Sequence, residues 1–175
     1  MIDHLLSING LKNEDVHLFK SELQPYKLKK KENFISIGQW CRNIALIEEG
    51  FLRTYHLDKD GKEVTTDFNQ PNTFCSSYYS FYAQQPSFEF ITAITDCDMH
   101  LLSYNSLQKL YASSWVMNVF GRSVLEKACV ERDFRLKKIM HLSAKAKYEW
   151  FLEKYLEVYK VAKLGHIASF LGISP

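Results

Sequence analysis

The stretch that decides the fold is ALIEEGFLRTYHLDKDGKEVTTDF, which spans residues 45–68. Gly50 separates two short apolar runs, and Asp58-Lys59-Asp60-Gly61 separates the second run from the return run of residues 62–68. Glycine can take the positive φ that a tight hairpin turn demands. The stretch therefore predicts three consecutive strands, joined by a turn at Gly50 and a hairpin turn at Gly61.

The same pattern of short apolar runs separated by turn residues continues on both sides of this stretch, from Tyr26 to Ser103. Residues 88–94 and 97–103 alternate apolar and polar side chains, which predicts a closing hairpin around Thr95-Asp96. Seven or eight short strands at this spacing predict an antiparallel barrel or roll. Short helices are expected before it, over Glu14–Leu23 with Asn13 as the N-cap, and after it, over Ser106–Tyr111. The predicted fold class is α+β, with an antiparallel β-roll.

Residues 114–140 predict a single long helix, because they contain no proline and only one glycine. At about 1.5 Å per residue this helix is roughly 40 Å long, longer than a small domain is wide. Its apolar arc, interrupted mainly by Arg132 and Arg135, is too wide for one contact and suits two: the chain's own domain and the same helix of a second subunit. The alternative is a long core helix of one globular domain. The candidate residues for the dimer helix are Phe120, Val124, Leu125, Ala128, Cys129, Arg132, Leu136 and Ile139.

The end of the sequence predicts the beginning of a helix-turn-helix. After a hinge at residues 141–143, an apolar stripe predicts an amphipathic helix over Ala144–Lys160. In GHIASFLGISP (residues 165–175) a small residue and a glycine stand four apart, which suits two crossing helices followed by a turn with positive φ. An ordinary helix hairpin is the alternative for this pattern taken alone. The candidate helix-turn-helix residues are Ile167, Ala168, Leu171, Gly172 and Ser174, and Ser174-Pro175 would cap and start the following helix.

This order of parts resembles the Crp/Fnr family of ligand-responsive transcription regulators over essentially the whole chain. The most specific similarities are residues 45–68 and 165–175. The resemblance implies a sensor domain over residues 1–112, built as a cyclic-nucleotide-binding-like double-stranded β-helix. It also implies a long dimerisation helix and hinge over residues 113–142, and the N-terminal part of a winged helix-turn-helix over residues 143–175, without the recognition helix. The partners it implies are DNA for the full-length protein and a second copy of the chain.

The segment that should hold a cyclic phosphate departs from the family pattern. In the family a Gly-Glu pair opens this cassette and an arginine followed by a small hydroxyl residue closes it on the phosphate. Here Cys75-Ser76 stands where Gly-Glu is expected, and no arginine or lysine occurs between Lys62 and Lys109. A buried phosphate beside the carboxylate of Glu89 is disfavoured without a cation. We therefore expect this cassette not to bind a cyclic nucleotide.

Aromatic and hydroxyl side chains take the place of the missing cassette residues. They would suit a neutral or aromatic small-molecule effector, whose identity the sequence does not give. The alternative is that these side chains fill the pocket themselves and nothing binds. The candidate pocket residues are Cys75, Ser76, Ser77, Tyr78, Tyr79, Tyr82, Phe88 and Glu89.

Composition and motifs argue against several other classes. The net charge of +2 permits a nucleic-acid partner without indicating one. A metal-dependent enzyme with a β-roll needs converging histidines, and only His56 and His100 lie in the strand region, so we expect no enzyme, no metal and no cofactor. The sequence shows no signal peptide and no apolar stretch long enough to span a membrane, which predicts a cytoplasmic protein. A stand-alone sensing or dimerisation module without a DNA role is the alternative function.

Overall fold

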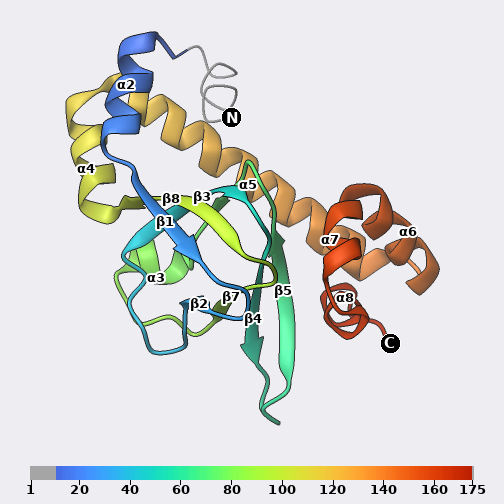
Figure 1. Cartoon of the computed structure of the whole chain (residues 1–175). Helices are drawn as coiled ribbons and strands as arrows, with labels where there is room; N and C mark the ends of the chain where they lie inside the picture. The colour runs from blue at the N-terminus through green and yellow to red at the C-terminus, as the bar shows by residue number, and fades with distance from the viewer. Residues whose placement is uncertain (1–10, 175) are drawn as a thin grey trace.

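A computed structural model describes residues 11–174, and its strands form two four-stranded antiparallel sheets that make up a β-roll (Figure 1). The strand order is β1-β8-β3-β6 in one sheet and β2-β7-β4-β5 in the other. The strands are β1 Gln24–Leu28, β2 Asn33–Ile35, β3 Asn43–Glu49, β4 Leu52–Leu57, β5 Glu63–Asn69, β6 Phe74–Cys75, β7 Phe90–Ala93 and β8 Cys97–Ser103. The helices are α2 Asn13–Ser21, α3 Tyr78–Ala83, α4 Tyr104–Ser113, α5 Trp115–His141, α6 Ala144–Lys154, α7 Leu156–Val161 and α8 Leu164–Leu171. The predicted α+β fold class with an antiparallel β-roll is confirmed.

The two predicted turns of residues 45–68 serve different purposes in the roll. Gly61 has a φ of +77° in the β4–β5 hairpin, where the Asp58 carboxylate accepts the backbone N–H groups of Asp60 and Lys62 at 2.9 and 3.0 Å. Gly50 has a φ of +91° and carries the chain from β3 in one sheet to β4 in the other. A Cβ at this position would overlap the Asp96 carbonyl oxygen, so the crossing needs both the positive φ and the missing side chain of glycine.

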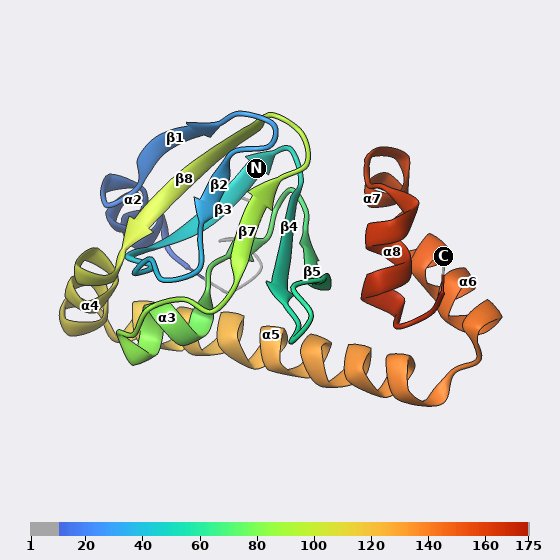
Figure 2. The ribbon, with the colours of Figure 1, turned by 90° about the horizontal axis from the view of Figure 1, so that it is seen from below.

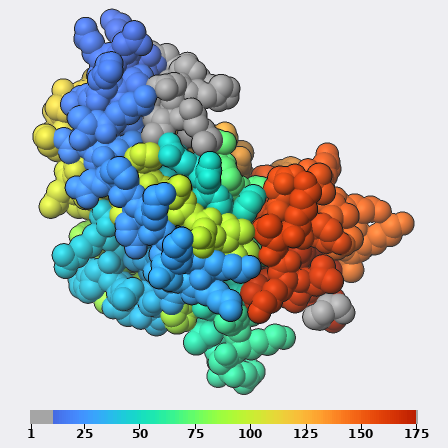
Figure 3. Space-filling model, viewed as in Figure 1, coloured from blue at the N-terminus to red at the C-terminus, as the bar shows by residue number. Residues whose placement is uncertain are grey.

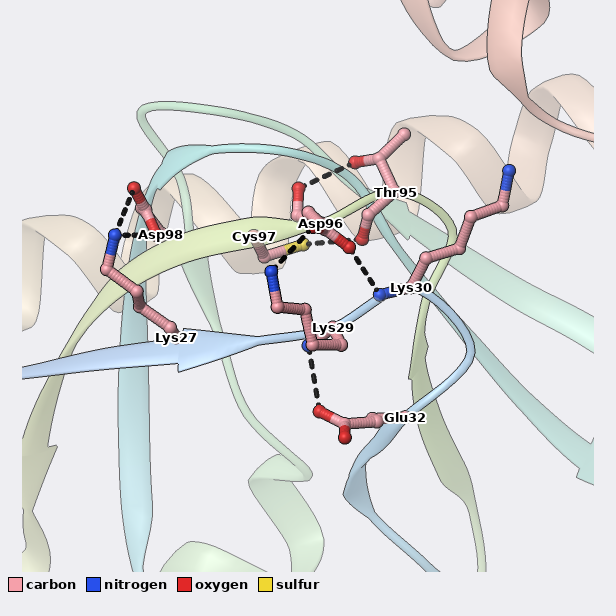
Figure 4. A network of polar contacts seen from close by, with 8 residues as sticks. All are labelled: Lys27, Lys29, Lys30, Glu32, Thr95, Asp96, Cys97 and Asp98. Atoms are coloured by element: carbon pink, nitrogen blue, oxygen red, sulfur yellow. Dashed lines mark hydrogen bonds and ion pairs between the residues drawn. The ribbon is translucent and has the colours of Figure 1, made fainter.

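Polar contacts fasten the corner where β1 and β2 meet the turn before β8 (Figure 4). Asp96 accepts the backbone N–H of Lys30 at 2.8 Å and the ammonium group of Lys29 at 2.9 Å. The Glu32 carboxylate accepts the backbone N–H of Lys29 at 2.8 Å. The bond from Lys30 and the ammonium of Lys29 lower the pKa of Asp96. β1 and β2 are therefore separate strands, divided by a corner that side-chain carboxylates stabilise.

The long helix α5 runs along the roll and continues past it to the C-terminal helices (Figures 1 and 2). The hydroxyl of Ser114 caps it by accepting the backbone N–H of Met117 at 3.3 Å. Met117 and Phe120 enter the main core, which fills the interior of the roll and includes the fully buried Leu52, Phe81 and Ile91. The long helix predicted over residues 114–140 is confirmed within one residue at either end.

Several predicted boundaries were wrong. The predicted helix Ala144–Lys160 is interrupted at Tyr155, whose φ and ψ are −123° and 34°, because its ring is buried among the rings of Trp150, Phe151 and Phe170. The short helix predicted over Ser106–Tyr111 is longer, since Ser103 caps it by accepting the N–H of Ser106. The first helix takes Lys12 rather than Asn13 as its N-cap. Pro175 lies outside the described residues.

Candidate functional site

The helix α3 lies in the segment predicted to hold a ligand, and buried hydroxyl groups hold it in place. The Ser80 hydroxyl accepts the backbone N–H of Cys41 at 2.8 Å and donates to the carbonyl of Gln85 at 2.6 Å. The hydroxyls of Ser77 and Ser87 lie 3.1 Å apart, and both side chains are buried. Phe81, on the same helix, is fully buried in the core. These contacts leave one side of α3 facing inward and the rings of Tyr78, Tyr79 and Tyr82 on the other side.

A cavity of about 400 Å³ lies where the roll, α5 and α6 meet. This volume is in the range of small-molecule sites in proteins. Sheet residues form one wall, aromatic residues of α3 and the neighbouring loops form the second, and α5 and α6 form the third. The lining residues are Thr54, Thr66, Asp67, Phe68, Asn69, Gln70, Thr73, Phe74, Ser76, Tyr78, Tyr79, Tyr82, Phe88, Glu89, Leu125, Ala128, Cys129, Glu131, Arg132, Arg135, Lys154 and Tyr155.

Only some of the pocket residues predicted from the sequence line this cavity. Cys75 and Ser77 are buried behind the wall and do not line the cavity. Burial raises the pKa of the Cys75 thiol well above its usual value, which keeps the thiol protonated and unreactive. The predicted residues that line the cavity are Ser76, Tyr78, Tyr79, Tyr82, Phe88 and Glu89.

The helical wall supplies cations that the sequence-based view of the cassette missed. Arg132 and Arg135 from α5 and Lys154 from α6 line the cavity, although the segment between Lys62 and Lys109 holds no cation. The cassette segment itself lacks a cation, as the sequence shows, whereas the cavity beside it has cations from the helices. A signal was present in the sequence, since Arg132 and Arg135 interrupt an otherwise apolar arc. What the sequence could not show is that this arc faces the cassette.

One pair of opposite charges joins the sheet wall to the helical wall. The guanidinium of Arg135 lies 2.6 Å from the carboxylate of Asp67 and 5.4 Å from the ring of Phe170 on α8. The Arg135 side chain is 9% exposed, while Asp67 is 41% exposed and lines the cavity. Burial raises the pKa of Asp67, and the charge of Arg135 opposes this shift. Asp67 and Arg135 thus connect the cavity to the packing of the last helix.

A second carboxylate on the sheet side lacks such a partner. Burial raises the pKa of Glu89, while a hydrogen bond from Ser77 and the charge of Arg132 oppose the shift. Within the described part of the chain, neither Glu89 nor Arg132 nor Lys154 forms an ion pair. Glu131 of α5 also lines the cavity and forms no ion pair with another described residue. The cavity therefore combines two carboxylates and two cations that have no ion pair in this part of the chain.

The last helix packs directly against the roll beside this cavity. The Ser169 hydroxyl of α8 accepts the backbone N–H of Thr65 at 3.0 Å and lies 3.4 Å from the carbonyl of Glu63. Phe68 of β5 packs against the rings of Phe151 and Phe170, with centroids 5.9 and 5.3 Å away. Figure 3 shows the surface of the C-terminal helices meeting that of the roll. The beginning of the predicted helix-turn-helix is thus docked on the predicted sensor domain.

Where α8 contacts the roll, some buried polar groups lack hydrogen-bond partners among the described residues. Arg53 is paired with Glu63, yet its Nε and the Thr65 hydroxyl are buried atoms that have no hydrogen-bond partner among the described residues. Burial lowers the pKa of the neighbouring His166, and the charge of Arg53 lowers it further. A buried polar atom without a partner costs about 1–3 kcal/mol. The contact between α8 and the roll therefore combines favourable aromatic packing with the free-energy cost of buried polar atoms that lack hydrogen-bond partners.

The residues predicted for the dimer helix fall on several sides of α5. Phe120 is buried against the roll and Val124 is partly buried there. Leu136 is 51% exposed, and Ile139 is half-buried and faces Gly172. The residues among them that line the cavity are Leu125, Ala128, Cys129 and Arg132.

The residues predicted for the helix-turn-helix adopt the expected local conformation. Ile167, Ala168 and Leu171 are buried, and Ser174 is exposed. Gly172 ends α8 in the left-handed conformation, with a φ of 62°. Ile173 packs partly against the C-terminal helices. The sequence pattern of small residue, glycine and apolar turn residue thus forms a helix end from which the chain can turn.

The described residues contain neither a metal-binding cluster nor a membrane-spanning helix. Between residues 11 and 174, no group of three or more histidine, cysteine, aspartate or glutamate residues could hold a metal ion. None of the helices in this part of the chain is long and apolar enough to cross a membrane.

Comparison with known proteins identifies the family. The family model of the cyclic nucleotide-binding domain matches residues 25–114, just over half of the 175 residues, and the chain belongs to this family. The similar structures include Crp/Fnr regulators, which confirms the resemblance inferred from the sequence. No curated protein sequence gave a match.

Three similar structures share the arrangement of the roll and long helix. FixK2 from Bradyrhizobium japonicum has a TM-score of 0.72 at 16% identity, over 87% of this chain and 78% of that protein. A putative Crp/Fnr transcriptional regulator from Eubacterium rectale has a TM-score of 0.71 at 20% identity, over 95% of this chain and 80% of the other. The c-di-GMP responsive regulator CLP from Xanthomonas campestris has a TM-score of 0.69 at 13% identity, over 93% and 86%. At these identities the likeness shows the fold.

Proposed function

We propose that this chain is the sensing and dimerising part of a DNA-binding transcription regulator of the Crp/Fnr type, and not an enzyme. The observation that carries the proposal is that α8, with its left-handed glycine end, docks on the same sheet that lines the cavity. A ligand in the cavity would contact the roll, α5 and α6 together, so its binding would change how the C-terminal helices are held. A regulator that acts on DNA in this way works in the cytoplasm.

Three functional parts follow from this proposal. Residues 1–112 form the sensor domain, residues 113–142 form the dimerisation helix and hinge, and residues 143–175 begin the winged helix-turn-helix. The hinge coincides with the end of α5 at His141 and the Ser143 cap of α6, whose hydroxyl accepts the N–H of Ala146 at 3.3 Å. DNA would be read by a helix that follows Ser174, because major-groove readout needs side chains from the second helix of this motif.

The proposed dimer pairs α5 with its copy around a two-fold axis. Leu125, Cys129, Arg132, Leu136 and Ile139 follow a 4-3-4-3 spacing and form the proposed seam. Leu136 supports this assignment because it is 51% exposed in the single chain. Leu136→Glu should yield a monomer in sedimentation at micromolar concentration, since two carboxylates would meet near the axis. Val130→Glu, on an exposed side of α5 away from the seam, is the matched control and should leave the dimer intact. A monomeric unmodified chain contradicts the proposal.

DNA binding is tested with the complete gene product and the DNA upstream of its own gene. We expect a sequence-selective mobility shift that withstands physiological salt. Residues 1–175 alone should give only weak, salt-sensitive binding through phosphate contacts. The proposal fails if the complete gene product does not discriminate between its upstream DNA and unrelated DNA of the same length.

A further inference from the structure

The charged residues that line the cavity are distributed unevenly between its walls. Its acidic groups are Asp67 and Glu89 on the sheet side and Glu131 on α5, whereas its cations, Arg132, Arg135 and Lys154, all come from the helices. The close contact between Arg135 and Asp67 pairs one charge of each sign. What remains is Glu89 on the sheet side, and Glu131 with Arg132 and Lys154 on the helical side. Among these remaining groups the helical wall has one more cation than carboxylates, so it is the wall that can attract an anion.

Arg132 is the best-placed of the remaining cations. Burial raises the pKa of Asp67, Tyr78 and Glu89, and the charge of Arg132 opposes this rise in all three, so the guanidinium is near each of these groups. It has no ion pair of its own within the part of the chain that the structure describes, and it lines the cavity. A guanidinium presents several N–H donors in one plane, and it binds a carboxylate through two parallel hydrogen bonds.

The wall next to Arg132 suits a flat apolar group. Phe74, Tyr78, Tyr79, Tyr82 and Phe88 all line the cavity. The rings of Tyr78 and Tyr82 are stacked with centroids 6.4 Å apart, and the rings of Tyr79 and Phe88 lie 5.2 Å apart. Tyr79 and Phe88 are each about half exposed, so their surfaces are accessible to a small molecule rather than packed into the core. An aromatic group could lie against these rings.

We propose that the cavity binds a small aromatic carboxylic acid, with the carboxylate on Arg132 of the helical wall and a hydrogen-bond donor of the ligand facing Glu89 on the sheet side. The proposal rests on the proposed function in taking this cavity as the sensory site. It places the anion on the helices, whereas the phosphate cassette of the family would place it between strands. An uncharged ligand, which the sequence suggested, gives Arg132 no partner. A cyclic nucleotide bound in the cassette would bring its phosphate to Glu89 rather than to a cation.

Lys154 extends the proposal to the C-terminal helices. This lysine lies at the end of α6 and also lines the cavity, where it adds positive potential beside the 5.7 Å contact of its ammonium group with the Tyr155 ring. An acid on the helical wall would therefore be attracted by α5 and α6 at once. The ligand would strengthen the connection between the long helix and the helices that begin the DNA-binding part.

The test uses isothermal titration calorimetry on residues 1–175 with a matched pair of probes. The acid probe is 3-(4-hydroxyphenyl)propionate, whose phenol can donate to Glu89, and the neutral probe is the corresponding amide. The net free energy of a hydrogen bond to a charged group corresponds to an about ten- to hundredfold change in the dissociation constant. The acid should therefore bind about ten- to hundredfold more tightly than the amide. Equal affinity of the two probes, or no saturable heat from the acid up to about 10 mM, overturns the proposal.

Variants on the helices locate the anion. Arg132→Gln should weaken binding of the acid by about ten- to hundredfold and leave the amide unchanged. Lys154→Gln should weaken it less, because a single point charge lacks the two parallel bonds. Arg122→Gln is the control on the same helix, since Arg122 is exposed, pairs with Glu126 and does not line the cavity. Arg132 is exposed in the single chain but also belongs to the proposed dimer seam, so sedimentation must first show that Arg132→Gln has the same oligomeric state as the unmodified chain. An unchanged affinity in Arg132→Gln overturns the assignment.

Cyclic AMP is the third probe, and we expect no saturable heat from it at physiological salt. If it binds more tightly than the acid, the family's own ligand class applies and the proposal is wrong. These measurements contain no DNA. Selective DNA binding by the complete gene product without binding of the acid therefore rejects only the ligand class, whereas binding of the acid without selective DNA binding rejects only the proposed function.

Discussion

Residues 11–174 form two hydrophobic cores, which differ in composition and in the elements that build them. The first fills the roll and is mostly aliphatic, and its described buried residues include members of every strand except β5 and of α2, α3, α4 and α5. The second is mostly aromatic and lies among α6, α7 and α8. Among the described residues of the roll, Phe68 is the buried contribution to this second core, with Phe51 and Ile94 partly buried beside it. The first is the core of the roll, and the second is also the contact between the roll and the C-terminal helices.

Because of this difference, we expect the chain to open locally at the second core. The roll core is closed by backbone pairing of two sheets around it, so its loss requires unfolding. The second core depends on a few aromatic rings on the roll side and carries buried polar atoms of Arg53 and Thr65 without partners. Local opening takes place where apolar contacts are few and the polar penalty is high. The C-terminal helices should therefore detach before the roll unfolds.

The largest expected effect comes from breaking the roll core at Phe81. This side chain is fully buried and packs edge-on against Tyr104 at 5.4 Å. Phe81→Ala should lower the free energy of unfolding by about 3–5 kcal/mol, because it removes a large buried ring and leaves a cavity. Urea unfolding measures the loss, and Phe81→Leu serves if the alanine variant does not fold. A loss below about 1 kcal/mol in both variants would contradict the assignment of Phe81 to the core.

Phe68→Ala should break the second core and leave the first intact. The expected loss is about 3 kcal/mol, at the lower end for a buried phenylalanine, and it should be confined to the docking of α6, α7 and α8. Hydrogen exchange should show faster exchange in α8 and unchanged exchange in β3 and β8. Phe88→Ala, at a phenylalanine that is 55% exposed, is the matched control and should change neither region. Equal acceleration of exchange in the roll would show that the two cores unfold together.

Glu89→Gln addresses the polar region between the cores and should have the smallest effect. Burial raises the pKa of Glu89 above its usual value, so the ionised carboxylate costs stability in the folded chain. The glutamine variant should be more stable at pH 7 by less than about 1 kcal/mol, the scale for partly exposed charges. The gain should shrink as the pH falls, and it should vanish below the usual glutamate pKa, where both states of the unmodified chain are protonated. Thermal unfolding from pH 4 to 8 tests this, with Glu49→Gln at an exposed position as the control.

The sequence was most informative where local chemistry determines the structure. Gly50 and Gly61 mark turns that need a positive φ, and their spacing identified the strands of the roll. The long helix and the glycine end of α8 were predicted for the same kind of reason. These features depend on neighbouring residues in the chain.

The parts that could not be predicted depend on residues far apart in the chain. The cations of the cavity come from α5 and α6, many residues after the cassette that they face. The break of the helix at Tyr155 follows from the packing of its ring against Phe170, which the amphipathic stripe does not show. Ser77, predicted to meet a ligand, is instead buried, with its hydroxyl 3.1 Å from that of Ser87.

The position of α8 has a consequence for how the chain stays in solution. β5 is the outermost strand of its sheet, and such an edge exposes backbone groups to which a strand of another molecule can pair. The Ser169 hydroxyl occupies the N–H of Thr65, and α8 lies along this edge (Figure 2). If α8 leaves the roll, as the proposed function requires, the same step uncovers a site for aggregation. The proposed control of transcription and protection against self-association would then share one helix, which would limit how long the released state can persist in a crowded cell.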